Sequence, residues 1–183
     1  MQARLRIVGQ APGKRVHETG IPWNDRSGQR LRDWLGLSAE SFYDPMNVAI
    51  IPMGLCYPGK GASGDKPPRP ECAPRWHRQL DQFLPALELT LLIGQYAQAY
   101  YLGKRRKDSL TATVQAWQEY LPQGFLPLPH PSPRNELWLR KNPWFEQELV
   151  PQLRLQIAAM NLQPHPASGN QPFGAQSREQ VEE

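Results

Sequence analysis

The sequence has few cysteines and no long apolar run. Its two cysteines, Cys56 and Cys72, exclude a framework of several disulfides. No apolar stretch approaches the roughly 20 residues that a membrane-spanning helix needs. The N-terminus lacks the charged-then-apolar layout of a signal peptide. We therefore expect a cytoplasmic protein that has no membrane partner and keeps its cysteines reduced.

The chain also lacks a strong charge of either sign. Its 21 Lys and Arg residues and 17 Asp and Glu residues give a formal net charge of +4. This modest excess favours a polyanionic partner, although it is also common in proteins that never meet nucleic acid. With 183 residues and 39% hydrophobic content, the chain can bury one core. We expect a monomer with one domain over residues 1–162 and a polar, disordered tail over residues 163–183.

Short apolar segments alternate with helical patterns along the chain. Strands are predicted at residues 5–8, 48–51, 87–93 and 125–128. Helices are predicted from an N-cap at Ser27 to Gly36, from Pro70 through Trp76, Leu80 and Phe83, and over residues 95–102, 110–120 and 143–160. This alternation predicts an α/β fold, a three-layer αβα sandwich with a central, mainly parallel sheet of four strands.

Three loops have unusual composition. Residues 9–13 follow the first predicted strand and residues 130–135 follow the fourth, and both segments are rich in Pro or Gly. Ligands of parallel sheets bind beyond the carboxyl ends of the strands, where both loops are expected. The Gly- and Pro-rich passage over residues 52–70 is a further candidate, because loops of that length are usually functional or disordered.

Two of these segments resemble the signature motifs of one enzyme family. The first is Gly9-Gln10-Ala11-Pro12-Gly13, continued by TGIPWNDRSG at residues 19–28, and the second is His130-Pro131-Ser132-Pro133-Arg134-Asn135. They resemble the two motifs of the uracil-DNA glycosylase superfamily, and the resemblance runs from about Leu5 to about Leu155. The second motif is similar to the single-strand-selective branch. The first is closer to the iron-sulfur fourth and fifth families.

The resemblance implies hydrolysis of the bond between a damaged base and its sugar in single- or double-stranded DNA. This reaction builds positive charge on the sugar and negative charge on the base, so it needs an anion and a hydrogen-bond donor. Asp25, similar to the carboxylate in the Gly-Asp-Arg-Ser-Gly run of the fifth family, and His130 fit those demands. Gln10 falls where the fourth family has a catalytic Glu, and Ala11 where the classical enzymes have Asp.

The resemblance also implies a set of substrate-binding residues. Trp23 takes the place of the aromatic residue that stacks on the extruded base, and Gln10 could orient water or merely close the turn. The base-recognising Asn of the family, placed shortly before the first loop cysteine, falls near Pro52 or Met53; Asn47 is nearby but precedes the strand. The remaining implied residues are those of the first loop, Gly9, Ala11, Pro12 and Gly13, and three of the second motif near the DNA backbone and minor groove, Ser132, Arg134 and Asn135.

Cys56 and Cys72 resemble the third and fourth ligands of the 4Fe-4S cluster in the iron-sulfur families. Such a cluster normally takes four thiolates. Relatives carry the first pair upstream of the first strand, so either the start is shortened or the cluster is lost. The chemistry itself requires no cofactor, and a cluster is expected only if an upstream cysteine pair is present in a longer protein.

Ordinary structural explanations compete with each assignment. Trp23 could belong to the core, Asp25 could be a helix-entry or turn residue, and the two cysteines could be buried thiols. The basic run at residues 104–107, with Arg134 and Lys141, could contact phosphates or form a solvated loop. At the level of function, a DNA glycosylase competes with an inactive DNA- or base-binding member of the superfamily, and with a hydrolase of free nucleosides or nucleotides.

Overall fold

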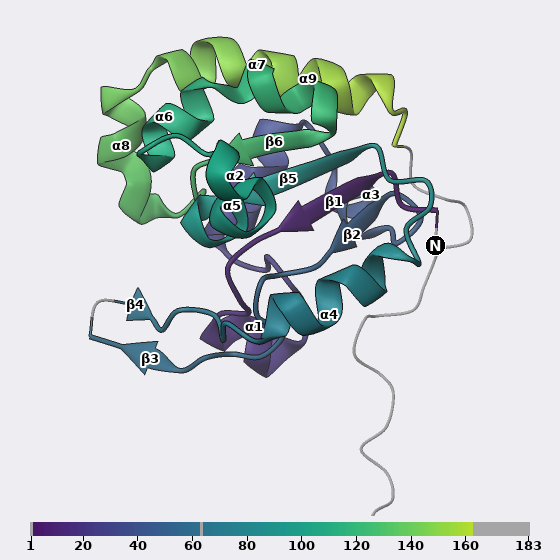
Figure 1. Ribbon diagram of the computed structural model, residues 1–183, viewed down its shortest axis with the longest axis vertical. Coiled ribbons are helices and arrows are strands. Elements are labelled where there is room, and N and C mark those ends of the chain that lie inside the picture. Colours follow the sequence, from purple (N-terminus) through teal and green to yellow (C-terminus); the bar gives the residue numbers. More distant parts are fainter. Residues whose placement is uncertain (1, 63, 163–183) are drawn as a thin grey trace, which may run out of the picture.

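A parallel sheet of four strands lies at the centre of the computed structural model, which describes residues 2–62 and 64–162 (Figure 1). The strand order is β2-β1-β5-β6, and every pair is parallel. The strands are β1 (Leu5–Val8), β2 (Val48–Ile50), β5 (Leu89–Ile93) and β6 (Phe125–Leu128). The predicted α/β fold with a mainly parallel four-stranded sheet is confirmed.

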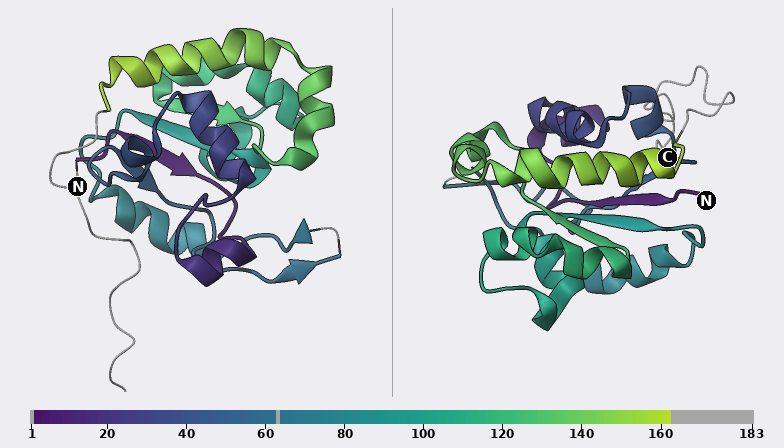
Figure 2. Two further views of the ribbon diagram at one scale, coloured as in Figure 1. Left: turned by 180° about the vertical axis from the view of Figure 1, so that it is seen from behind. Right: turned by 90° about the horizontal axis from the view of Figure 1, so that it is seen from above.

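Helices cover both faces of the sheet (Figure 2). One face carries α2 (Arg26–Leu35) and α3 (Ala39–Tyr43), with α9 (Val150–Ala159) packed against α2. The other carries α4 (Cys72–Asp81), α5 (Gly94–Leu102), α6 (Leu110–Gln115) and α7 (Trp117–Tyr120). The shorter elements are α1 (Lys14–Thr19), α8 (Glu136–Lys141), and the 3₁₀ turns Gly103–Arg105, Leu121–Gln123 and Pro133–Asn135.

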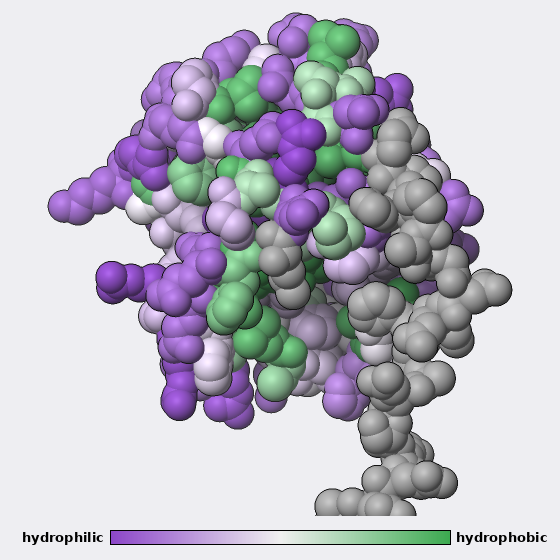
Figure 3. Space-filling model, turned by 90° about the vertical axis from the view of Figure 1, so that its right-hand side faces the viewer, coloured by the Kyte–Doolittle hydropathy of each residue, from purple (hydrophilic) through white to green (hydrophobic). Residues whose placement is uncertain are grey.

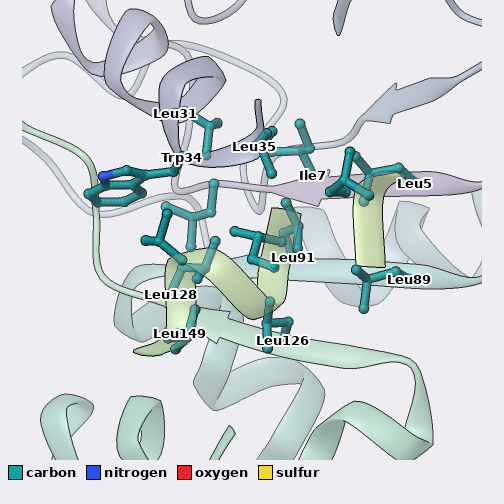
Figure 4. Close-up of a cluster of buried hydrophobic side chains, with 14 of the residues drawn as sticks. Leu5, Ile7, Leu31, Trp34, Leu35, Leu89, Leu91, Leu126, Leu128 and Leu149 are labelled. Atoms are coloured by element: carbon teal, nitrogen blue, oxygen red, sulfur yellow. The ribbon is translucent and has the colours of Figure 1, made fainter. Parts of the chain in front are cut away.

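Side chains of the central strands alternate between two hydrophobic clusters. Leu5, Ile7 and Leu91 point into the larger cluster with Leu31 and Leu35 of α2 (Figure 4). Neighbouring strand residues such as Val8 and Leu92 pack instead with Ala97 and Tyr120 on the opposite face. This period of two, with every residue of β1 and β5 buried, is expected for strands covered on both sides.

Strand β6 contains Pro127, which has no backbone N–H to donate to a neighbouring strand. The sheet accommodates this residue because β6 lies at the edge and pairs with β5 alone. Strand β6 ends at Leu128, and after Pro129 the second motif begins at His130, at the carboxyl end of the strand, as predicted.

Three predicted helices differ from the observed ones. The predicted helix over residues 110–120 is divided at Ala116, whose ψ of 21° departs from helical values. The predicted helix over residues 143–160 begins with a π-helical segment, Phe145–Leu149, and becomes regular in α9. The helix expected from Pro70 starts at Cys72, and its apolar marker residues Trp76 and Phe83 are exposed, by 39% and 61%.

The buried side of α4 carries polar groups in place of those markers. His77 is buried, and its ring nitrogens bond Tyr101 Oη at 2.6 Å and the carbonyl oxygen of Pro52 at 3.0 Å. Arg6, buried within β1, bonds Asp81 of α4 and Thr90 of β5. This network satisfies polar groups that would be costly to bury unpaired.

The amino ends of the strands lie on the side of the molecule where the chain begins. Figure 3 shows this side, with hydrophilic side chains around much of its margin and hydrophobic ones between them. Within residues 2–62 and 64–162, no helix is both long and apolar enough to cross a membrane. The tail predicted over residues 163–183 lies outside the described residues.

Candidate active site

A cavity of about 670 Å³ lies at the carboxyl ends of the strands. It is lined by the first motif loop, by Trp23 and Asp25, and by His130 of the second motif. These segments come from opposite ends of the sequence. Because the strands are parallel, the loops that follow them meet beyond the same ends of the sheet. The cavity volume is within the usual range for small-molecule sites, roughly 300 to 1,000 Å³.

Backbone hydrogen bonds hold the first motif loop against the segment that follows β2. The carbonyl oxygens of Gly9 and Gln10 each accept a hydrogen bond at 2.9 Å, from the amides of Met53 and Gly54 respectively. The Gln10 side chain donates from Nε2 to the carbonyl oxygen of Lys66 at 3.1 Å. Gln10 therefore fastens the segment after β2 to the motif loop. The other loop residues expected at the site, Ala11, Pro12 and Gly13, also line the cavity.

Trp23 forms one wall of the cavity and also packs on the core. Its φ of +56° is unusual for a bulky residue, and its indole lies so close to Gly9 that a Cβ there would be 2.9 Å from Cζ2. A Cβ on Gly28 would lie 1.7 Å from the Trp23 carbonyl oxygen. Both glycines are thus required by the placement of Trp23. Trp23 therefore packs against the core on one side and lines the cavity on the other.

Asp25 caps helix α2 and also lines the cavity. Its Oδ1 accepts a hydrogen bond from the amide of Gly28 at 2.8 Å, so Asp25 is the N-cap and the prediction of Ser27 was wrong. The physical reason is that Asp25 has the extended backbone of an N-cap, whereas Ser27 already lies inside the helix. The predicted end of the helix at Gly36 is confirmed. Among the described residues, none bonds Oδ2 of Asp25, which leaves that oxygen for a ligand.

His130 is held as a neutral ring. The amide of Ser132 donates to its Nδ1 at 3.1 Å, which requires an unprotonated Nδ1 and places the ring proton on Nε2. Burial lowers the pKa of His130, and the negative charge of Asp25 offsets part of that effect. At neutral pH the imidazole therefore presents an Nε2–H donor at the cavity wall.

The other second-motif residues have distinct positions. Ser132 and Arg134 line the cavity, and Ser132 Oγ accepts a hydrogen bond from the Arg134 amide at 3.2 Å. Asn135 does not line the cavity. Its Nδ2 instead donates to the His130 carbonyl oxygen at 2.7 Å. Asn135 thereby fixes the backbone that carries the imidazole.

A small hairpin that the sequence did not predict completes the cavity wall. Its strands are β3 (Lys60–Gly61) and β4 (Gly64–Asp65), and the side chains of Lys60 and Asp65 line the cavity. Gly59 and Gly64, with φ of +86° and +138°, are the turn signals that could have revealed it. Sequence reasoning also missed other lining residues, among them Lys14, Arg15 and Tyr57.

Asn47 lies at the opposite end of β2 from the cavity, as expected from its place before the strand. It is buried, and its carbonyl oxygen accepts a hydrogen bond from the Leu5 amide at 3.1 Å, at the start of β1. Pro52 lines the cavity instead, and the amide of Met53 is already bonded to Gly9. Neither Pro52 nor Met53 offers a side-chain amide to a base.

The two cysteines do not complete a cluster site. Cys56 is exposed, and Cys72 is half-buried at the start of α4; both are free thiols. A 4Fe-4S cluster normally takes four thiolates, and the sequence has two. Within the part of the chain that the structure describes, no group of three or more His, Cys, Asp or Glu side chains could hold a metal ion.

The basic run at residues 104–107 lies away from the motif cavity. Lys104, Arg106 and Lys107 line a different cavity between α5 and the start of α6. Lys107 also forms an ion pair with Glu119 at 2.7 Å. Lys14 and Arg15 of α1 are the exposed basic residues that line the motif cavity, together with Lys60 and Arg134.

Comparisons with known proteins identify the same family as the two motifs do. The sequence model of a family described as the Uracil DNA glycosylase superfamily matches residues 1–154. The chain is also similar to a protein from Sulfurisphaera tokodaii named type-4 uracil-DNA glycosylase, with 24% identity over 124 residues. That alignment covers 66% of this chain and 53% of the relative, so it spans about half the length of that relative.

Proposed function

This chain belongs to the uracil-DNA glycosylase superfamily, and from that membership we propose that it hydrolyses the N-glycosidic bond of uracil or another deaminated base in DNA. The observation that carries the proposal is that a neutral imidazole, a carboxylate and an aromatic ring line one cavity. These are His130, Asp25 and Trp23, and they come from both family motifs. Such a reaction would begin base excision repair.

His130 is the group that acts on the departing base. As the bond breaks, the base gains negative charge, and the Nε2–H of the neutral imidazole donates a hydrogen bond to a base oxygen. The bond from Ser132 to Nδ1 holds the ring in the tautomer that this donation requires. Removal of one such donor typically costs about 3 to 4 kcal/mol of transition-state stabilisation, a rate factor of roughly 100 to 1,000.

Asp25 acts on the sugar and Trp23 on the extruded nucleotide. The carboxylate stabilises the positive charge that develops on the sugar through Oδ2, because Oδ1 is engaged by the Gly28 amide. Extrusion of a nucleotide from the duplex costs a few kcal/mol. Stacking on an aromatic side chain contributes about 1 to 3 kcal/mol per base, which offsets part of that cost.

The proposal is tested with oligonucleotides that carry one uracil, hypoxanthine or xanthine, as single strands and as duplexes. Pro52 and Met53 offer no side-chain amide for base recognition, so all three bases belong in the panel. We expect at least one substrate to gain an alkali-labile site, and Asp25→Asn and His130→Ala each to suppress it. A wild-type protein inert on every substrate contradicts the proposal.

A second candidate is a DNA- or base-binding protein without turnover. It is favoured by one observation, that Gln10 and Ala11 are neutral at the two positions where relatives of this family carry the first-motif carboxylate. Tight, salt-sensitive binding of DNA without any alkali-labile product would select this candidate.

We further propose that Cys56 and Cys72 would form half of a cluster site if a longer version of the chain supplied a second cysteine pair. No step of the chemistry above depends on such a cluster. The test compares the visible absorbance of protein expressed with and without additional upstream codons. Brown protein from the longer version alone supports the proposal, and colourless protein from both contradicts it.

A further inference from the structure

The hairpin β3–β4 connects the two motif loops across the cavity. On one side, Gln10 Nε2 donates to the carbonyl oxygen of Lys66, the residue that follows β4. On the other side, a Cβ on Gly64 would lie 2.7 Å from Nη1 of Arg134 in the second motif. Lys66 also donates its amide to the Gly59 carbonyl oxygen at 2.9 Å, which closes the base of the hairpin. Lys66 therefore lies against the first motif and Gly64 against the second.

This arrangement brings a second carboxylate to the cavity. Asp65, the last residue of β4, lines the cavity, and its Oδ2 lies 3.6 Å from the position that a Cβ on Gly13 would occupy. Its Oδ1 faces Tyr57 Oη at 3.5 Å, a long contact that restrains the carboxylate weakly. Among the described residues, none bonds Oδ2 of Asp65. That oxygen is available to a ligand beside the first motif loop.

Asp65 lies beside a motif loop that has no carboxylate of its own. The loop from Gly9 to Gly13 carries no acidic side chain, and its residues Gln10 and Ala11 are neutral. Asp25 reaches the cavity from the start of α2, on the side where its charge acts on His130. Asp65 reaches it from the hairpin, against Gly13. The two carboxylates therefore line the cavity from different segments of the fold.

We propose that Asp65 is a further catalytic residue, which replaces the missing first-motif carboxylate and stabilises the positive charge that develops on the sugar. This inference rests on the proposed function. Gln10 supports this role of Asp65, because its side chain donates a hydrogen bond to the carbonyl oxygen of Lys66, the next residue in the chain. This carboxylate belongs to the hairpin and not to the motif, so the motif residues alone do not reveal it.

The step balances without a cofactor. The bond between the sugar C1′ and the base nitrogen breaks, and its electron pair leaves with the base. Water forms a new bond to C1′, and its proton passes to a carboxylate and then to solvent. The base takes up a proton from solvent after the His130 Nε2–H has stabilised its negative charge. Asp65 and Asp25 share the work of countering the cationic sugar and accepting the proton.

Binding of a charged sugar mimic tests this role without turnover. The probes are two matched DNA duplexes, one with a pyrrolidine abasic analogue whose ring nitrogen is protonated, and one with a neutral tetrahydrofuran analogue. We expect the wild type to bind the cationic duplex about tenfold more tightly than the neutral one at fixed salt. Asp65→Asn should reduce this preference, and the remainder is the contribution of Asp25. Asp108→Asn is the matched control, because Asp108 is an exposed Asp that lines the other cavity.

The outcomes separate this inference from the proposed function. A wild type with no preference for the cation, or an Asp65→Asn variant with the full wild-type preference, overturns the role of Asp65, whatever the activity on damaged bases. If the wild type cleaves no damaged base and Asp65→Asn still reduces the preference, turnover fails and the electrostatic role of Asp65 stands. Thermal unfolding of both variants verifies that they fold, as expected for exposed side chains.

Discussion

The imidazole of His130 lies against the indole of Trp23, with ring centroids 5.6 Å apart and planes inclined by 36°. The contact joins the two motifs directly, because Trp23 precedes α2 and His130 follows β6. Burial against such neighbours lowers the pKa of His130. One aromatic contact thus links the shape of the cavity to the protonation state of the group that we propose acts on the base.

The protonation state of His130 predicts a pH dependence. The proposed mechanism requires the neutral ring, so the rate should be constant through neutral pH and fall on acidification, as the ring protonates at a pKa below the ordinary value of 6.5. Protonation also converts Nδ1 into a donor and breaks the hydrogen bond from Ser132. The measurement is the single-turnover rate against pH. A rate that rises on acidification through this range would contradict the assignment.

The coupling between Asp25 and His130 can be measured separately. The negative charge of Asp25 favours the protonated imidazole, so Asp25→Asn should lower the pKa of His130 further. An NMR titration of the His130 ring against pH reports this shift in the absence of substrate. Asp33→Asn, on the exposed surface of α2, is the control and should leave the titration unchanged. A His130 pKa that rises in Asp25→Asn would show that the two groups are not coupled as described.

Two substitutions separate the capping role of Asp25 from its chemical role. Asn is as good an N-cap as Asp, so Asp25→Asn should leave the free energy of unfolding nearly unchanged while activity falls. Asp25→Ala removes the acceptor for the Gly28 amide and should cost about 1 kcal/mol in addition. Urea denaturation and the cleavage assay give the two readouts. Full activity in Asp25→Asn would reduce Asp25 to a structural residue.

Gly28 should tolerate no side chain. A Cβ there would lie 1.7 Å from the Trp23 carbonyl oxygen, a backbone atom that cannot move without displacing the loop or α2. Gly28→Ala should therefore destabilise the fold by about 3 kcal/mol, at the upper end of the usual cost of overpacking. The neighbouring exposed Gln29, changed to Ala, should alter the unfolding free energy by less than about 0.5 kcal/mol. Equal stabilities of the two variants would show that Trp23 is placed differently.

Arg15 is expected to contact DNA backbone phosphate. It is exposed on α1 and lines the motif cavity, whereas the basic run at residues 104–107 does not. Arg15→Ala should weaken DNA binding similarly for all sequences and reduce the slope of log affinity against log salt by about 1. Lys104→Ala is the control with a smaller effect. The reverse order of the two slopes would move the DNA path to the other cavity.

The strands and the motif loops were predictable because their signals are local. Buried parallel strands are continuous apolar runs, and Pro and Gly mark where each ends, so the positions of the first loop and of His130 followed from the sequence. The hairpin that carries Asp65 was not predictable in the same way. Its strands have two residues each, too short for a periodic pattern, and its place depends on contacts with Gln10 and Arg134 from distant segments.

Helix α4 shows a second limit of pattern reasoning. Trp76 and Phe83 have the spacing of a buried face, but the helix buries His77, whose ring is satisfied by Tyr101 and the Pro52 carbonyl oxygen. A hydrophobicity pattern cannot anticipate a buried polar group whose partners lie on other elements. The N-cap of α2 was misplaced by two residues for a related reason, since Ser and Asp are both favoured caps and the backbone geometry decides between them.

The most direct test of the account is detection of the free base. Wild-type protein is incubated with DNA that carries one uracil, hypoxanthine or xanthine, and mass spectrometry measures released base against abasic sites formed. We predict equal amounts of both from at least one substrate, and a rate roughly 100 to 1,000 times lower for His130→Ala. Release of base at the wild-type rate by His130→Ala, or no release from any substrate by the wild type, would contradict the account.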